Sequence, residues 1–182
     1  SSSRIARSSF HGLVVLTLAL ALLFAVLLPD TVPTQFNLRA TLSDKSVIAL
    51  LALAATIPMV TGKIDLTVGY GIVLWHILAI SLQTRFGVPW PAAVLIVVLC
   101  AALFGVLNGL LVELAQIDSF IATLGTGTVI YAVALWHSGG RQVVGELPEG
   151  FVEIAGANLL GLPVGAFYVL AVSVALWLVT EF

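Results

Sequence analysis

The chain has 182 residues, of which 60% are apolar and 9% are charged, and its mean hydropathy is +1.17. Soluble domains carry about 25% charged residues, so this composition excludes an ordinary soluble fold and requires lipid as the solvent. The net charge of −2 gives no reason to expect a nucleic-acid partner or an acidic ligand. Cys100 is the only cysteine, which excludes a disulfide framework and a cysteine metal site.

Apolar runs divide the chain into segments that are candidates for spanning a bilayer. A spanning helix needs about 20 mostly apolar residues, because its backbone polar groups must be satisfied internally. We therefore predict an all-α, polytopic transmembrane helix bundle of about six helices, or five if one run does not span, in a single domain over residues 1–182. The predicted helices are Gly12 to Leu28, Val47 to Val60, Gly69 to Leu82, Pro91 to Leu114, Phe120 to Trp136, and Leu159 to Val179 interrupted by Pro163.

Positive charges near the first run suggest the orientation. Arg4 and Arg7 precede it closely, whereas the positive charges beyond it are farther away. The first helix usually dominates orientation, so we place the amino terminus in the cytoplasm. Both chain ends then lie inside, and residues 29–46 and 137–158 face outward.

The second and third runs are too short to cross a bilayer alone, and the polar segment Thr61 to Gly69 lies between them. One interpretation is a broken or re-entrant helix whose free backbone groups line a cavity for a polar solute. Asp65 within a bilayer would then need a partner or water, because such a residue costs about 2.5–3.5 kcal/mol at a helix centre. The other interpretation is a short cytoplasmic turn with Lys63 and Asp65 solvated.

The fourth and fifth runs carry small and polar residues. Gly105 and Gly109 have the small-xxx-small spacing that favours close helix packing, and Asn108 beside them either hydrogen-bonds across that contact or faces a solute. We expect the small and hydroxylated face of the fifth run to point into the protein, where its hydroxyls satisfy helix carbonyls or line a pathway. That face comprises Thr123, Gly125, Thr126, Gly127 and Thr128.

No cofactor or metal site is predicted. His11, His76 and His137 lie in different segments without metal-ligand spacing or a nucleophile motif, so we expect structural roles for them. Thr61-Gly62-Lys63 lacks the first glycine of a phosphate-binding loop, since Ile57 stands there, and Ile64 follows the lysine. The chain is therefore not expected to bind ATP.

Four motifs in order resemble the permeases of bacterial ABC importers for monosaccharides, of the ribose and xylose type. Residues 61–69 look like that family's Thr-Gly-Gly-Ile-Asp-Leu-Ser-Val-Gly segment, and the match continues through 105–109, 120–126 and 161–164. This resemblance implies an inner-membrane, multi-pass transport subunit rather than an enzyme. It also implies four kinds of partner: a separate ATPase subunit, a periplasmic sugar-binding protein, a second permease subunit and membrane lipid.

A permease must offer groups that replace the hydration of its solute in one state and release it in another. We predict that the substrate pathway is lined by Thr61, Asp65, Thr67, Asn108, Thr123 and Thr126. The resemblance also implies that the chain is the amino-terminal part of such a permease, with the ATPase-coupling segment lying beyond Phe182.

Several residues depart from the family pattern and leave the sugar open. They are Lys63 in place of a glycine, Ser119 where proline is common, and the bulkier Pro58, Tyr70, Trp75 and His76. Two alternatives remain. A proton-coupled secondary carrier would depend on Asp65 or Glu113 as a titrating group. A membrane enzyme would centre its reaction on His76 or His137, and a structural membrane-spanning protein is the remaining form of this alternative.

Overall fold

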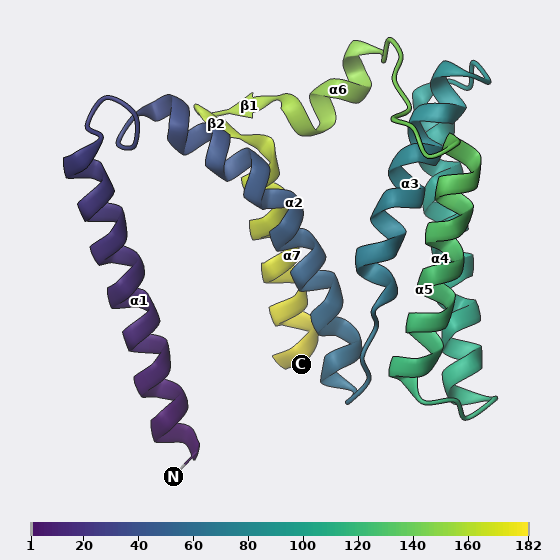
Figure 1. The fold of residues 1–182 in the computed structure, drawn as a ribbon, viewed down its shortest axis with the longest axis horizontal. Helices are drawn as coiled ribbons and strands as arrows, with labels where there is room; N and C mark the ends of the chain where they lie inside the picture. The colour runs from purple at the N-terminus through teal and green to yellow at the C-terminus, as the bar shows by residue number, and fades with distance from the viewer. Residues whose placement is uncertain (1, 182) are drawn as a thin grey trace.

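The computed structural model describes the backbone of residues 2–181 and the side chains of residues 12–180. Within these residues the chain forms seven helices and one small hairpin (Figure 1). The elements are α1 (Ser2–Leu27), α2 (Gln35–Val60), α3 (Thr67–Thr84), α4 (Trp90–Glu113), α5 (Ser119–Ser138), α6 (Glu149–Gly156), β1 (Asn158–Leu159), β2 (Leu162–Pro163) and α7 (Val164–Glu181). Six helices are long, as predicted, and the all-α fold class is confirmed.

The long helices run up and down in alternation (Figure 1). α3, α4 and α5 pack together as one group, and α2 pairs with α7. α6 and the β1–β2 hairpin cross above these groups, while α1 stands to one side (Figure 1). The start of α1 and the end of α7 lie on the same side, together with the turns that follow α2 and α4. This arrangement agrees with the prediction that both ends share one side.

Four helices are long and apolar enough to cross a membrane, namely α2, α3, α4 and α5. Shorter apolar stretches lie in α1 (Gly12–Leu27) and α7 (Val164–Thr180). Large apolar side chains cover the outside of these helices: Leu22, for example, is 72% exposed and Leu103 is 65% exposed. Such a surface is the one that lipid solvates, so the chain is a multi-pass membrane protein.

The predicted start of the second helix at Val47 is wrong, because α2 begins at Gln35. The Thr34 side chain caps this end by accepting a hydrogen bond from the Asn37 backbone N–H at 3.2 Å. Hydropathy marks only the apolar half of this helix. The polar half continues above it, where Arg39 Nε donates to the Gly161 carbonyl at 2.7 Å.

The predicted sixth helix also starts later than expected, since Leu159 belongs to the hairpin and α7 begins at Val164. β1 and β2 pair antiparallel, with Leu159 opposite Leu162. The two loop residues both have positive φ, 52° at Leu160 and 81° at Gly161, as a type I′ hairpin turn requires. Pro163 therefore precedes a helix start instead of kinking a helix.

Two glycines permit the closest helix contacts. A Cβ on Gly127 of α5 would lie 2.5 Å from Tyr70 Cδ2 of α3, and one on Gly165 of α7 would lie 2.8 Å from Ser46 Cβ of α2. Small residues allow helix backbones to approach in lipid, where little hydrophobic force drives association. The α3–α5 and α2–α7 pairs thus each depend on a residue without a side chain.

Candidate functional site

α2 ends in a glycine-dependent cap. Gly62 has φ of +75°, its N–H donates to the Met59 carbonyl at 3.0 Å, and the Lys63 N–H donates to the Pro58 carbonyl at 3.0 Å. This pair of bonds is a Schellman motif, which closes a helix with a left-handed residue. The backbone after Gly62 therefore leaves the helix and turns back along the bundle (Figure 1).

Residues 63–66 form an irregular segment that runs along the first turns of α5, and Leu66 already has helical backbone angles. The Ile64 N–H donates to Ser119 Oγ at 3.1 Å, and the Leu66 N–H donates to Thr123 Oγ1 at 3.1 Å. Two residues of the segment, from Ile64 to Leu66, and four residues of α5, from Ser119 to Thr123, each advance about 6 Å along the bundle. Both hydrogen bonds can therefore form at the same time. The chain is non-helical at residues 61–66 as predicted, but the expectation that the flanking helices are too short to cross a bilayer is wrong, because α2 has 26 residues and α3 has 18. α3 begins beside the second turn of α5.

Asp65 begins a chain of polar contacts at the start of α3. Its Oδ1 accepts the Thr67 backbone N–H at 2.8 Å and also the Thr67 hydroxyl. Asn108 of α4 in turn donates from Nδ2 to Thr67 Oγ1 at 3.4 Å. Thr67 and Asn108 are both buried, at 8% and 5% exposure. The chain ties the broken segment to α4.

The structure brings five of the six predicted pathway residues to one region. Thr123 is buried and links α5 to the irregular segment, while Thr61 donates to the Pro58 carbonyl at the end of α2. Thr126 lies apart from them: its hydroxyl donates to the Ala122 carbonyl of its own helix at 2.9 Å. Thr126 lines neither of the cavities described next.

Two adjoining cavities meet at Asp65. The smaller, of about 210 Å³, extends toward the turns after α2 and α4, and the larger, of about 450 Å³, extends into the bundle between α2, α3 and α4. Asp65 and Gly105 line both. The wall of the smaller cavity includes Thr61, Lys63, Asn108, Glu113, Ser119 and Thr123. Polar groups of the broken segment therefore face space large enough for a small solute.

The larger cavity is mainly apolar and aromatic. Trp75 of α3 and Phe104 of α4 line it, their rings meeting edge to face with centroids 6.2 Å apart. Thr67 and His76 add polar groups. A cavity with aromatic walls and a few polar groups suits a small molecule that has both apolar and hydroxylated faces.

The expectation that Gly105 and Gly109 mediate close helix packing is wrong. A Cβ on either residue would have no atom within 4 Å among its described neighbours, and both glycines line the smaller cavity. The expected inward face of α5 is correct for Thr123 and Gly127, which are buried. It is wrong for Gly125 and Thr128, which are exposed because they lie on the opposite side of the helix.

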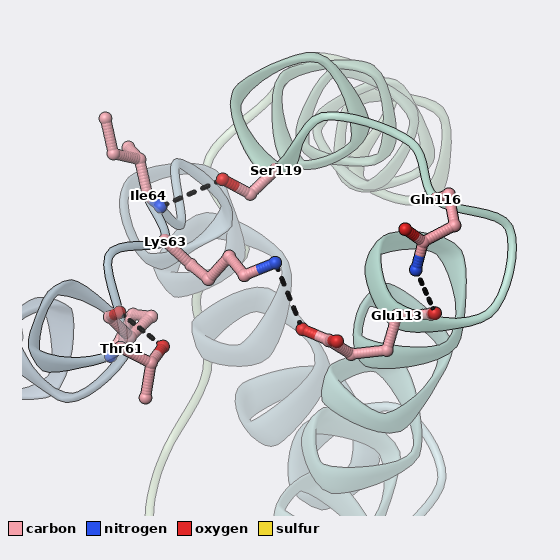
Figure 2. A network of polar contacts seen from close by, with 7 residues as sticks. Thr61, Lys63, Ile64, Glu113, Gln116 and Ser119 are labelled. Carbon is pink, nitrogen blue, oxygen red and sulfur yellow. Dashed lines mark hydrogen bonds and ion pairs between the residues drawn. The ribbon is translucent and has the colours of Figure 1, made fainter.

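An ion pair lies across the mouth of the smaller cavity. Lys63 Nζ is 3.2 Å from Glu113 Oε1, and the two side chains are 42% and 65% exposed. Figure 2 shows Lys63 reaching from the broken segment toward Glu113 at the end of α4, beside the Ile64–Ser119 hydrogen bond. This pair joins the same two elements as the Asp65–Thr67–Asn108 contacts.

The histidines have separate surroundings. His137 Nε2 lies 3.0 Å from Ser81 Oγ, a contact between α5 and α3, while His76 is exposed at the wall of the larger cavity. Among the described residues, no three His, Cys, Asp or Glu side chains gather where they could hold a metal ion.

Sequence reasoning missed the roles of three residues at these cavities. Ser119 accepts a backbone hydrogen bond from the broken segment, and Trp75 and Phe104 form the aromatic wall. Trp75 was visible only as a departure from the family pattern. Phe104 sits in a uniformly apolar run, so no local signal distinguishes its face.

Comparisons with known proteins identify the family of this chain. Residues 37–182 match the family described as "Branched-chain amino acid transport system / permease component". The chain is also 34% identical over 141 residues to proteins named "Autoinducer 2 import system permease protein LsrD" from Escherichia coli K12, Escherichia coli O157:H7 and Shigella flexneri. The match covers 75% of this chain and 42% of each relative.

This chain thus spans less than half the length of the curated relatives that it matches. No solved structure matches it. The matched family consists of transporter membrane subunits rather than enzymes, and the family model covers most of the chain, including all four motifs singled out in the sequence. The chain therefore belongs to the permease family of ABC importers that this model describes.

Proposed function

We propose that the chain is part of a transmembrane permease subunit of an ABC importer, and that it forms the translocation pathway for a monosaccharide across the bacterial inner membrane. The observation that carries this proposal is the pair of cavities that meet at Asp65, where the broken segment between α2 and α3 faces α4 and α5. The polar wall of the smaller cavity supplies groups that replace the hydration of a small hydroxylated solute. Thr61, Asp65, Thr67, Asn108 and Thr123 are the proposed pathway residues, and the position of Thr126 makes it a weaker candidate.

The charges at the site favour an uncharged solute. Lys63 and Glu113 lie at the mouth of the smaller cavity and pair with each other, and Asp65 accepts hydrogen bonds at the start of α3. A zwitterionic amino acid would need an available cation for its carboxylate, whereas a sugar needs hydroxyl, amide and carboxylate partners. The aromatic pair Trp75 and Phe104 offers a surface for the apolar face of a sugar ring.

The proposed partners follow from the family. A separate ATPase subunit hydrolyses ATP, a periplasmic binding protein delivers the sugar, and a second permease subunit, identical or related, completes the pathway in the lipid bilayer. The positions of Arg4 and Arg7 in α1, before its apolar stretch Gly12–Leu27, support an amino terminus in the cytoplasm. The turns after α2 and α4, with Lys63 and Glu113, then face the cytoplasm.

Transport by the complete importer in proteoliposomes tests this function. The compounds tested separately are D-ribose, D-xylose, autoinducer 2 and leucine. Autoinducer 2 is included because it appears in the names of the relatives, and leucine because the family description mentions branched-chain amino acids. The proposal expects ATP-dependent uptake of a monosaccharide that persists when a protonophore collapses the proton gradient. Uptake of leucine alone would contradict the choice of substrate. Uptake that stops with the proton gradient while ATP remains would support the secondary-carrier alternative.

A further inference from the structure

We propose that Asn108 is a residue that determines specificity, and that its Oδ1 accepts a hydrogen bond from one hydroxyl of the transported solute. This inference rests on the proposed function and deepens it. Asn108 lies on α4 in the wall of the smaller cavity, opposite the broken segment.

The Asn108 side chain carries an acceptor that the protein leaves unused. The residue is 5% exposed, and no donor among the described residues reaches its Oδ1. A buried acceptor without a partner is costly, and nearly all such groups in folded proteins are satisfied. Asn108 lines the smaller cavity, so we assign the missing donor to a molecule in that cavity.

The hydrogen bonds around Thr67 fix which end of the amide is free. Thr67 has one hydroxyl hydrogen, and Asp65 Oδ1, which can only accept when ionised, takes it. Thr67 Oγ1 can therefore only accept from its other neighbour. The Asn108 atom that faces it must be Nδ2, which leaves Oδ1 without a protein partner. Asp65 thus sets the direction of the whole chain of bonds.

Asn108 also has room to turn toward the cavity. Its hydrogen bond to Thr67 Oγ1 is 3.4 Å long, beyond the usual range of about 2.7–3.2 Å for such bonds. A small rotation of the Asn108 side chain therefore costs little hydrogen-bond energy. Gly105 and Gly109, which also line the smaller cavity, carry no side chain to obstruct it. A solute hydroxyl in the smaller cavity can then reach Oδ1.

The chemistry of this acceptor defines a class of solute. Its partner must bring a hydrogen-bond donor without a negative charge, because a carboxylate has no hydrogen to give and Asp65 lines the same cavity. A hydroxyl of an uncharged, polyhydroxylated ring meets both conditions.

Uptake of singly deoxygenated analogues by the full-length permease with its partner subunits tests this contact. The probe is D-ribose or D-xylose, whichever the wild-type importer transports, and the set of its monodeoxy forms. Asn108→Leu removes both polar atoms at similar volume, and Leu107→Ala, at an exposed neighbour on α4, is the matched control. Each rate is divided by the wild-type rate for the same compound, so that selection by the binding protein cancels.

Asn108→Leu is expected to lower uptake of the parent sugar about tenfold, while uptake of the one analogue that lacks the contacted hydroxyl stays near its wild-type rate. Leu107→Ala is expected to leave every ratio unchanged. An equal loss for all compounds, or no loss, would overturn the inference while leaving the transport function intact. If the wild-type importer transports no monosaccharide, the proposed function fails and the inference fails with it.

A second variant keeps the test decisive if Asn108→Leu does not reach the membrane. Thr67→Val removes the oxygen that orients the Asn108 amide. In this variant, the uptake rate of the analogue that lacks the contacted hydroxyl is expected to be closer to that of the parent sugar than in the wild type. An unchanged pattern across the analogues in Thr67→Val would then overturn the inference.

Discussion

Asp65 Oδ1 accepts both the backbone N–H and the hydroxyl of Thr67, the first residue of α3. One carboxylate oxygen thereby both starts the helix and orients the side chain that meets Asn108. Asp65→Ala is expected to lower the free energy of unfolding by about 0.5–2 kcal/mol, the usual cost of losing a helix cap. Asp65→Asn keeps an oxygen at this position and is the matched control. Thermal unfolding of the detergent-solubilised protein measures both, and equal stability of Asp65→Ala and wild type would contradict the capping role.

Two glycines on α5 differ in what surrounds them. A Cβ on Gly127 would lie 2.5 Å from the Tyr70 ring, whereas one on Gly125 would meet no atom within 4 Å. Gly127→Ala is therefore expected to destabilise the protein by about 1–3 kcal/mol through overpacking against α3. Gly125→Ala should not destabilise it, because alanine favours the helix. The same unfolding assay compares the pair, and identical melting temperatures would show that the α3–α5 contact is looser than described.

The Lys63–Glu113 ion pair is expected to add little to stability. Both side chains are substantially exposed, so water screens their attraction. Lys63→Ala and Glu113→Ala should each change the free energy of unfolding by less than about 1 kcal/mol. Chemical denaturation at low and high salt provides the measurement. A larger loss that persists at high salt would mean that the pair is better shielded from water and ions than its exposure indicates.

The sequence predicted the helices well where hydropathy alone decides. The runs from Pro91 and Phe120 match α4 and α5 within a few residues, because both helices are apolar along most of their length. Boundaries failed where polar residues continue a helix or where a turn interrupts an apolar run. Gln35 starts α2 through a threonine cap outside the apolar stretch, and Leu159 belongs to a hairpin despite its hydrophobic character.

The candidate site was predictable in its local motif but not in its long-range contacts. Thr61 to Thr67 carry a recognisable break, since glycine ends the first helix and aspartate starts the next. The partners of this segment lie about 40 to 60 positions away along the chain, as in the Leu66–Thr123 bond, where the separation is 57. No periodicity within one run indicates which helix face meets another, so Gly105 was assigned to packing instead of to the cavities.

Labelling of single cysteines tests the central claim, that the cavities meeting at Asp65 form a route for solute. Cys100→Ser removes the one cysteine of this chain, any cysteine elsewhere in the complete importer is replaced likewise, and Gly105→Cys or Leu107→Cys is then introduced. Gly105 lines both cavities, and Leu107, two residues farther along α4, is 56% exposed on the apolar surface. A charged, water-soluble thiol reagent should modify the cysteine at position 105, more slowly when the transported sugar is present, and should not modify the one at position 107. Equal reactivity at both positions, or modification at 105 that sugar does not slow, would contradict the account.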